Sequence, residues 1–226
     1  MSTTKPSFPE EDWPWIWAIE DRDNLDWTTE FKNDADGLRA KEEEQKNLPV
    51  LISSPPDNPC FVFLSNMETA FDFERLSSLG ITHVINVAGE VMEGEQEQYT
   101  KANIKRTTIE AEDEEGYPVL KEHWEEFQNF VKSAPAGSNI LVHCVAGINR
   151  SAVFVAAHKL VSEQKNVLDV VAHLRRQRGN WALHNGSFID QLVAFARTNG
   201  LLGPRPGEPC CRVAEKAPPY DSFRRY

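Results

Sequence analysis

The segment from His143 to Ser151 constrains this chain more than any other stretch, because it joins a strand pattern to a helix pattern. Residues 139–142 form a short apolar run typical of a buried strand, and residues 151–161 are apolar almost all round, as in a buried helix. A loop in this position gathers successive backbone N–H groups and the positive end of the helix dipole around one point. The sequence therefore predicts an anion-binding loop here.

Three residues in the loop indicate what it could bind and do. Gly147 allows the backbone to turn tightly around a bound group. Arg150 offers a planar fork that can hold two phosphate oxygens. The Cys144 thiol would lie in the same positive field, which favours the nucleophilic thiolate. The alternative interpretation is a buried cysteine in a tight turn with Arg150 in a surface ion pair, and the strand and helix on either side favour the anion site.

The loop resembles the Cys-x5-Arg loop of the protein tyrosine phosphatase superfamily, and its flanking residues narrow this to the dual-specificity phosphatases. The pairs His143-Cys144, Ala146-Gly147 and Arg150-Ser151 match that family's His-Cys-x-Ala-Gly-x-x-Arg-Ser. The resemblance covers roughly residues 58–202. It includes residues 79–87, similar to the family's second strand, and residues 185–192, similar to the start of its last helix.

The resemblance implies a fold and a set of roles. The fold would be α/β, with a mostly parallel central sheet flanked by helices. Cys144 would form a phosphocysteine intermediate, and Ser151 would stabilise the thiolate that leaves in the second step. His143 would orient the loop and favour the thiolate. Arg150 would bind the phosphate oxygens together with the backbone of Val145, Ala146, Gly147, Ile148 and Asn149.

A general acid is needed to protonate the leaving group, and it must come from a separate loop. The acidic stretch 110–115 follows a predicted strand and precedes a predicted helix. Asp113 fits the family's position for the acid best, Glu112 is the second choice, and Glu114 the third. The same run of carboxylates could also be a solvated surface loop.

The expected substrates are phosphotyrosine and phosphoserine or phosphothreonine of proteins. Asn149 departs from the serine that many family members carry before the arginine, and related RNA 5′-triphosphatases also have Asn-Arg there. The net charge of −11 argues against a nucleic-acid substrate. The loop also lacks the lysines of lipid-directed members. The alternatives are a phosphatase of an RNA 5′ end, a phosphoinositide or a phosphoglucan, and a phosphate-binding scaffold with little catalysis, which Cys144 argues against.

Composition divides the chain into three parts. Residues 1–57 form an acidic extension containing tryptophans, residues 58–202 the catalytic domain, and residues 203–226 a proline-containing tail expected to be flexible. Trp13, Trp15 and Trp17 alternate, which suits an extended strand packed on the chain's own domain or on a protein partner. The sequence leaves the oligomeric state open.

Within the catalytic domain, strand and helix patterns alternate. Strands are predicted at 61–64, 81–87, 104–109 and 139–142. Helices are predicted at 68–79, 120–131 and 151–161, and around the apolar positions of 167–174 and 188–195.

Cysteine and histidine spacing predicts no disulfide scaffold, no metal and no cofactor. The four cysteines are Cys60, Cys144, Cys210 and Cys211, with Cys60 interpreted as a buried structural residue. A reducing compartment, cytoplasm or nucleus, is expected. No apolar run is long enough for a membrane span.

Overall fold

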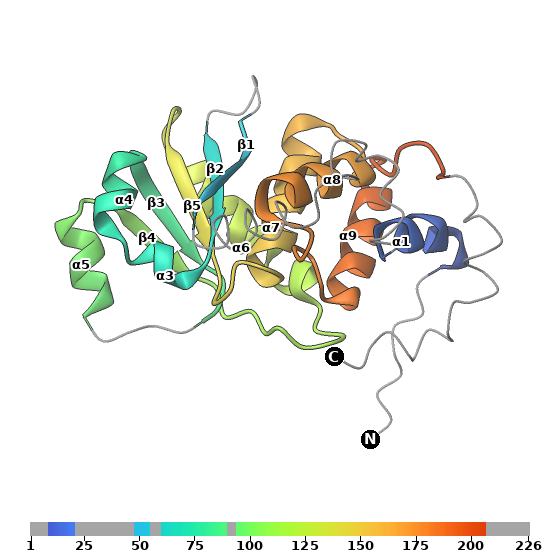
Figure 1. Ribbon diagram of the computed structural model, residues 1–226, viewed down its shortest axis with the longest axis horizontal. Helices are drawn as coiled ribbons and strands as arrows, with labels where there is room; N and C mark the ends of the chain where they lie inside the picture. The colour runs from blue at the N-terminus through green and yellow to red at the C-terminus, as the bar shows by residue number, and fades with distance from the viewer. Residues whose placement is uncertain (1–8, 21–47, 55–59, 90–93, 207–226) are drawn as a thin grey trace, which may run out of the picture.

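A five-stranded sheet forms the centre of the molecule in the computed structural model, which describes residues 9–20, 48–54, 60–89 and 94–206 (Figure 1). The strands lie in the order β1-β2-β5-β3-β4. Their bounds are β1 Val50–Ser53, β2 Phe61–Ser65, β3 Ile81–Asn86, β4 Lys105–Thr108 and β5 Asn139–His143. Only the β1–β2 pairing is antiparallel among these strands, so the expected mostly parallel sheet is confirmed.

Helices cover both faces of the sheet and enclose two separate apolar clusters (Figure 1). The larger cluster packs one face against α1 (Trp13–Glu20), α6 (Val119–Ser133), α7 (Arg150–Glu163), α8 (Val167–Arg178) and α9 (Gly186–Thr198). The smaller cluster packs the other face against α3 (Met67–Ala70), α4 (Phe73–Ser78) and α5 (Glu95–Lys101). Side chains alternate along β5 between the two, with Ile140 and Val142 in the larger cluster and Leu141 in the smaller.

The central strand and the central helix follow one another directly. Strand β5 is paired on both sides, with β2 and with β3. Helix α7 is buried along residues 151–160, as its uniformly apolar sequence predicts. The loop between them, residues 144–149, therefore lies at the carboxyl end of the middle strand, where open α/β sheets place their ligands.

The tryptophan segment forms a helix, so the predicted extended strand is wrong. Trp15, Ile16 and Ile19 are buried in the larger cluster, and their spacing suits one face of a helix. Trp13 and Trp17, four residues apart, lie together with ring centroids 5.6 Å apart. The alternation of tryptophans thus reflects two helical faces. The predicted packing on the chain's own domain is confirmed.

Two side-chain bonds at opposite ends hold this helix in place. The Arg175 guanidinium donates to the Ile19 carbonyl at 2.7 Å, near the helix C-terminus. Before the helix begins, Arg197 on α9 forms an ion pair with Asp12 at 3.1 Å. Residues of the predicted extension therefore belong to the packed body of the molecule.

The single helix predicted for residues 68–79 is two short helices. Asn66 caps α3 by accepting from the Thr69 N–H at 3.0 Å, and Asp72 caps α4 by accepting from the Arg75 N–H at 3.0 Å. The second cap restarts the helix in a new direction, because an N-cap residue has a non-helical backbone. Strand β1 and helix α5 were not predicted.

The domain boundaries and the C-terminal tail remain predictions from the sequence. The division at residues 57 and 202 stays a prediction, although β1 lies before the first boundary and pairs within the sheet. Residues 207–226, with Cys210 and Cys211, lie outside the described part of the chain. Among the helices that are described, none is both long and apolar enough to cross a lipid bilayer.

Candidate active site

The loop of residues 144–149 is held from outside through its backbone carbonyls. The Val145 carbonyl accepts a hydrogen bond from the backbone N–H of Met67 at 3.0 Å. The Ile148 carbonyl accepts one from the backbone N–H of Leu183 at 2.9 Å. These donors follow β2 and α8, so two separate parts of the chain fix the loop.

The middle of the loop is held by Arg178, the last residue of α8. Its guanidinium donates to the carbonyls of Ala146 and Gly147, each at 3.3 Å. The side chain is fully buried, and its guanidinium lies 5.1 Å from the centre of the Trp181 ring. Burial lowers the pKa of Arg178 to about 10, an effect opposed by the nearby Cys144. Arg178 therefore stays charged at pH 7 and adds a buried positive charge beside the loop.

The outward carbonyls determine where the N–H groups point. A trans peptide unit directs its C=O and the following N–H to opposite sides. With the carbonyls of Val145 to Ile148 turned outward, the N–H groups of residues 146–149 turn inward. The Gly147 N–H shows this orientation, because it donates to Cys144 Sγ at 3.2 Å. Together with the N-terminus of α7, these groups form a cradle that favours a bound anion.

Only glycine fits at position 147. Its φ of +69° lies in the left-handed region that side chains rarely adopt. A Cβ atom there would also collide with the Ser65 carbonyl and with Nη2 of Arg178. The sequence predicts a tight turn at this glycine. The structure adds a second reason for glycine, which is the close approach of this residue to Ser65 of β2 and Arg178 of α8.

Cys144 lies at the base of the cradle, with 1% of its surface exposed. Its Sγ accepts hydrogen bonds from the Gly147 N–H and from the Ser151 hydroxyl, both at 3.2 Å. Hydrogen-bond donors directed at a sulfur atom stabilise its anionic form over the thiol. The predicted neighbours of the cysteine are therefore brought to it by the fold.

His143 is fully buried behind the cysteine. Burial lowers the pKa of His143 to about 4, so the imidazole is neutral at pH 7. Its Nδ1 lies 3.4 Å from the Cys144 carbonyl oxygen. A neutral, enclosed ring in this position can support the backbone of the loop but is not placed to carry protons to a substrate.

Arg150 and Asp113 meet at the opening of the cradle. Nη1 of Arg150 donates to the carbonyls of Ala88 and Ala111, each at 3.4 Å. Its Nε lies 3.6 Å from Oδ2 of Asp113, whose side chain comes from the loop after β4. The fold thus brings the predicted acid to the predicted phosphate-binding arginine, across a separation of 37 positions in the sequence.

Residues 62–198 match the family model described as the catalytic domain of dual specificity phosphatases. The chain belongs to the dual-specificity phosphatase family. Dual specificity protein phosphatase 26 from Bos taurus is 30% identical over 138 residues, which are 60% of this chain and 64% of the relative. The chain thus spans less than two thirds of the curated relatives that it matches first.

Solved structures of similar proteins agree with the fold of this family member. A crystal structure of DUSP15 matches with a TM-score of 0.52 and 26% identity, covering 70% of this chain and 97% of that one. The Yvh1 phosphatase domain from Chaetomium thermophilum matches with a TM-score of 0.56 and 20% identity, covering 70% and 100%. The resemblance drawn from the loop and its flanking motifs is confirmed.

Sequence reasoning missed two side chains that shape the site. Arg178 ends a helix whose last turn also contains Arg175 and Arg176, a common pattern at helix C-termini that gives no sign of a buried role. In the sequence, Asn185 stands out only as part of a motif similar to the start of the family's last helix. Its capping position before an apolar helix was the available signal, but its contact with Asp113 depends on tertiary structure.

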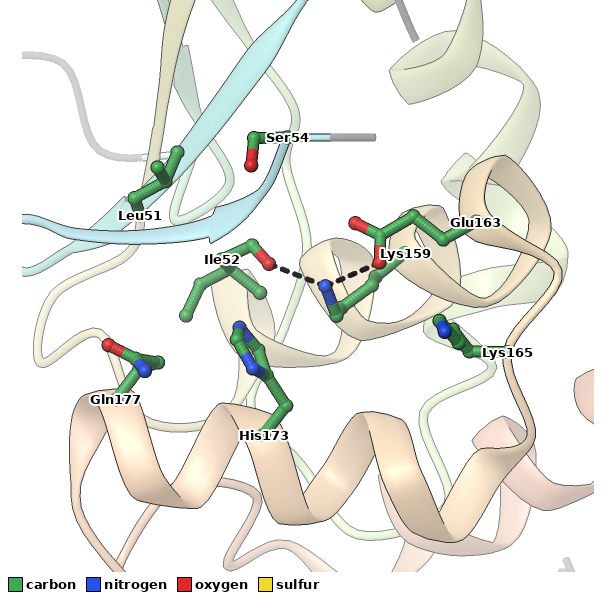
Figure 2. Close-up of a pocket in the computed structure, with 8 residues that line it drawn as sticks. All are labelled: Leu51, Ile52, Ser54, Lys159, Glu163, Lys165, His173 and Gln177. Carbon is green, nitrogen blue, oxygen red and sulfur yellow. Dashed lines mark hydrogen bonds and ion pairs between the residues drawn. The ribbon is translucent and has the colours of Figure 1, made fainter. Parts of the chain in front are cut away.

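A cavity of about 510 Å³ lies away from this site, between β1, α7 and α8 (Figure 2). At its floor, Lys159 Nζ donates to the Ile52 carbonyl at 2.9 Å and pairs with Glu163 at 2.6 Å (Figure 2). The bond to Ile52 fastens β1 to α7, while the ion pair with Glu163 lies within α7. Among the described residues, no group of three histidine, cysteine, aspartate or glutamate side chains could hold a metal ion.

Replacing Arg178 with methionine should lower the free energy of unfolding by about 3 kcal/mol, because buried carbonyls lose a charged donor. Tungstate, an oxyanion probe of the cradle, should bind more than about tenfold more weakly. Arg178→Lys keeps the charge without the planar fork. Its free energy of unfolding and its tungstate affinity should lie between those of the wild type and those of Arg178→Met. The control is Arg176→Met, an exposed residue on the same helix turn. Denaturant titration and calorimetry measure both quantities, and equal values for all four proteins would contradict this role of Arg178.

Proposed function

We propose that this protein hydrolyses phosphate monoesters through a covalent cysteine intermediate, with phosphotyrosine and phosphoserine or phosphothreonine of proteins as substrates. The observation that carries the proposal is the position of Cys144 Sγ at the base of a cradle of N–H groups, within hydrogen-bond distance of Gly147 and Ser151. Membership of the dual-specificity phosphatase family supports it.

In the first step, the Cys144 thiolate attacks phosphorus and the bond from phosphorus to the ester oxygen breaks. The inward N–H groups and Arg150 stabilise the charge on the three remaining phosphate oxygens. The leaving oxygen takes a proton from Asp113, without which an alkoxide would leave slowly. The products are the free alcohol or phenol and a phosphocysteine.

In the second step, water attacks the phosphocysteine while the Asp113 carboxylate accepts a proton from it. The sulfur–phosphorus bond breaks, inorganic phosphate forms, and the Ser151 hydroxyl stabilises the departing thiolate. The Ser151 to Cys144 distance of 3.2 Å supports this role. Asp113 is protonated again at the end, so the cycle closes without a cofactor.

The surroundings of the site support protein substrates over polyanions. The loop that carries Asp113 also exposes carboxylates at Glu110, Glu112, Glu114 and Glu115. These charges would repel RNA 5′ ends and phosphoinositides, whose phosphates extend beyond the cradle. Val145, 43% exposed at the edge of the loop, gives a protein side chain an apolar contact. A reactive thiol also requires a reducing compartment, so we place the enzyme in the cytoplasm or nucleus.

Cys144→Ser should lower the hydrolysis of an aryl phosphate and of phosphopeptides by on the order of 10³-fold or more. Cys60→Ser is the matched control, because Cys60 is equally buried but contacts the carbonyls of Ala134 and Pro135 away from the site. It should keep its activity. Full activity in Cys144→Ser would contradict the mechanism.

Asp113→Asn should slow alkyl phosphates by about 10²-fold or more and aryl phosphates with good leaving groups far less. The reason is that only a poor leaving group needs the proton. Glu112→Gln, the neighbouring carboxylate, is the control, and its rates on the two substrate classes should keep their ratio. If Glu112→Gln shows the selective loss instead, Glu112 is the acid.

A further inference from the structure

Asp113 is contacted by two asparagine side chains as well as by Arg150. Its Oδ1 accepts from Asn185 Nδ2 at 3.2 Å, and its Oδ2 accepts from Asn149 Nδ2 at 3.4 Å. One asparagine precedes Arg150 in the cradle, and the other caps helix α9. The carboxylate is therefore held between two parts of the fold.

The direction of each amide is set by other hydrogen bonds. Oδ1 of Asn149 accepts from the backbone N–H groups of His184 and Asn185, at 2.8 and 3.0 Å. Oδ1 of Asn185 accepts from the N–H and the hydroxyl of Ser187, at 3.0 and 2.8 Å. Because donors occupy both amide oxygens, both NH2 groups must be the ends that face Asp113.

This arrangement joins three segments that are far apart in sequence. The amide of Asn149 accepts from the segment that precedes α9 and donates to the loop of Asp113, while its backbone belongs to the cradle. A serine here, common in the family, has a shorter side chain with one hydroxyl and could not make both contacts. Asn149, which departs from the family pattern, therefore connects the loop that carries Asp113 to the cradle.

No helix or strand fixes the position of Asp113 in its loop. Residues 109–114 form neither helix nor strand, and Asp113 is exposed. A proton donor works only when it is held within reach of the leaving oxygen, and a displacement of about 1 Å can cost on the order of 10²-fold in rate. The two asparagine amides approach the two oxygens of the carboxylate at 3.2 and 3.4 Å, so each oxygen has its own donor.

We infer that Asn149 and Asn185 are positioning residues that hold Asp113 over the cradle, and that they thereby determine how well this enzyme cleaves esters of poor leaving groups. These are the alkyl esters, phosphoserine and phosphothreonine, as opposed to aryl esters. The inference rests on the proposed role of Asp113 as general acid.

The test uses one substitution, asparagine to serine, at three helix-capping positions. Asn185→Ser and Asn149→Ser remove the NH2 donors to Asp113. Asn166→Ser is the control, because Asn166 caps α8 and donates to Asp169 in the same way, at 2.6 Å, outside the site. Serine remains a good capping residue, so Asn185→Ser and Asn166→Ser should retain their helices.

The measured quantity is the ratio of kcat/KM for an alkyl phosphate to that for p-nitrophenyl phosphate. We expect Asn149→Ser and Asn185→Ser to lower this ratio about tenfold, less than the loss of the acid itself. Asn166→Ser should leave the ratio at the wild-type value. In an Asp113→Asn background, neither Asn149→Ser nor Asn185→Ser should change the ratio further, because the carboxyl group that Asn149 and Asn185 position is gone.

Two results would overturn the inference while leaving the proposed function intact. One is a lowered ratio in Asp113→Asn together with a wild-type ratio in both Asn149→Ser and Asn185→Ser. The other is a loss in the site variants that persists unchanged in the Asp113→Asn background, as a purely structural role would give. If Asp113→Asn itself shows no selectivity, the acid assignment fails and the inference fails with it.

Discussion

Four consecutive backbone carbonyls, from Val145 to Ile148, accept hydrogen bonds from groups outside their loop, and the geometry of the site depends on this constraint. It turns the N–H groups inward, one of which reaches Cys144 Sγ. The donors of these hydrogen bonds come from three places far from the loop in sequence: after β2, at the end of α8 and in the segment before α9. The sheet and helices position these donors, and the donors in turn position the loop.

Arg178 places a positive charge beside the cradle of an acidic protein. The chain carries a net charge of −11, yet a fully buried guanidinium lies beside the cradle. Burying a guanidinium costs several kcal/mol unless its donors are satisfied. Here they reach the carbonyls of Ala146, Gly147 and Leu48, with an aromatic ring beside the charge. A buried positive charge thus lies beside the cradle, while the nearby loop exposes Glu110, Glu112, Glu114 and Glu115.

Much of this site can be read from the sequence because its core is local. The apolar strand, the glycine, the cysteine and the apolar helix are contiguous, so pattern and motif identify them together. The four predicted strands and the buried helix α7 agree with the structure for the same reason. The fold brings together four of the predicted residues, Cys144, Ser151, Arg150 and Asp113. The choice of Asp113 among the carboxylates of its loop rests on the family's spacing as well as on the sequence pattern.

The features that sequence analysis missed depend on contacts between distant segments. The alternating tryptophans fit a strand by period, yet burial against α8 and α9 makes that segment a helix. The break at Asp72 is an exception, because its cap bond is local and reaches only the Arg75 N–H, three positions away. Arg178 and Asn185 act through partners that are 31 and 72 positions away, and no local pattern encodes such pairs.

The measurement that tests the central claim most directly is the identification of the phosphorylated residue during turnover. The enzyme is mixed with a phosphate ester, quenched in acid within the first turnover, and mapped by peptide mass spectrometry. We expect a phosphoryl group on Cys144 of the wild-type enzyme, and none in Cys144→Ser. Rapid turnover with the phosphoryl group on another side chain, or with no phosphoenzyme under conditions that trap one, would contradict it.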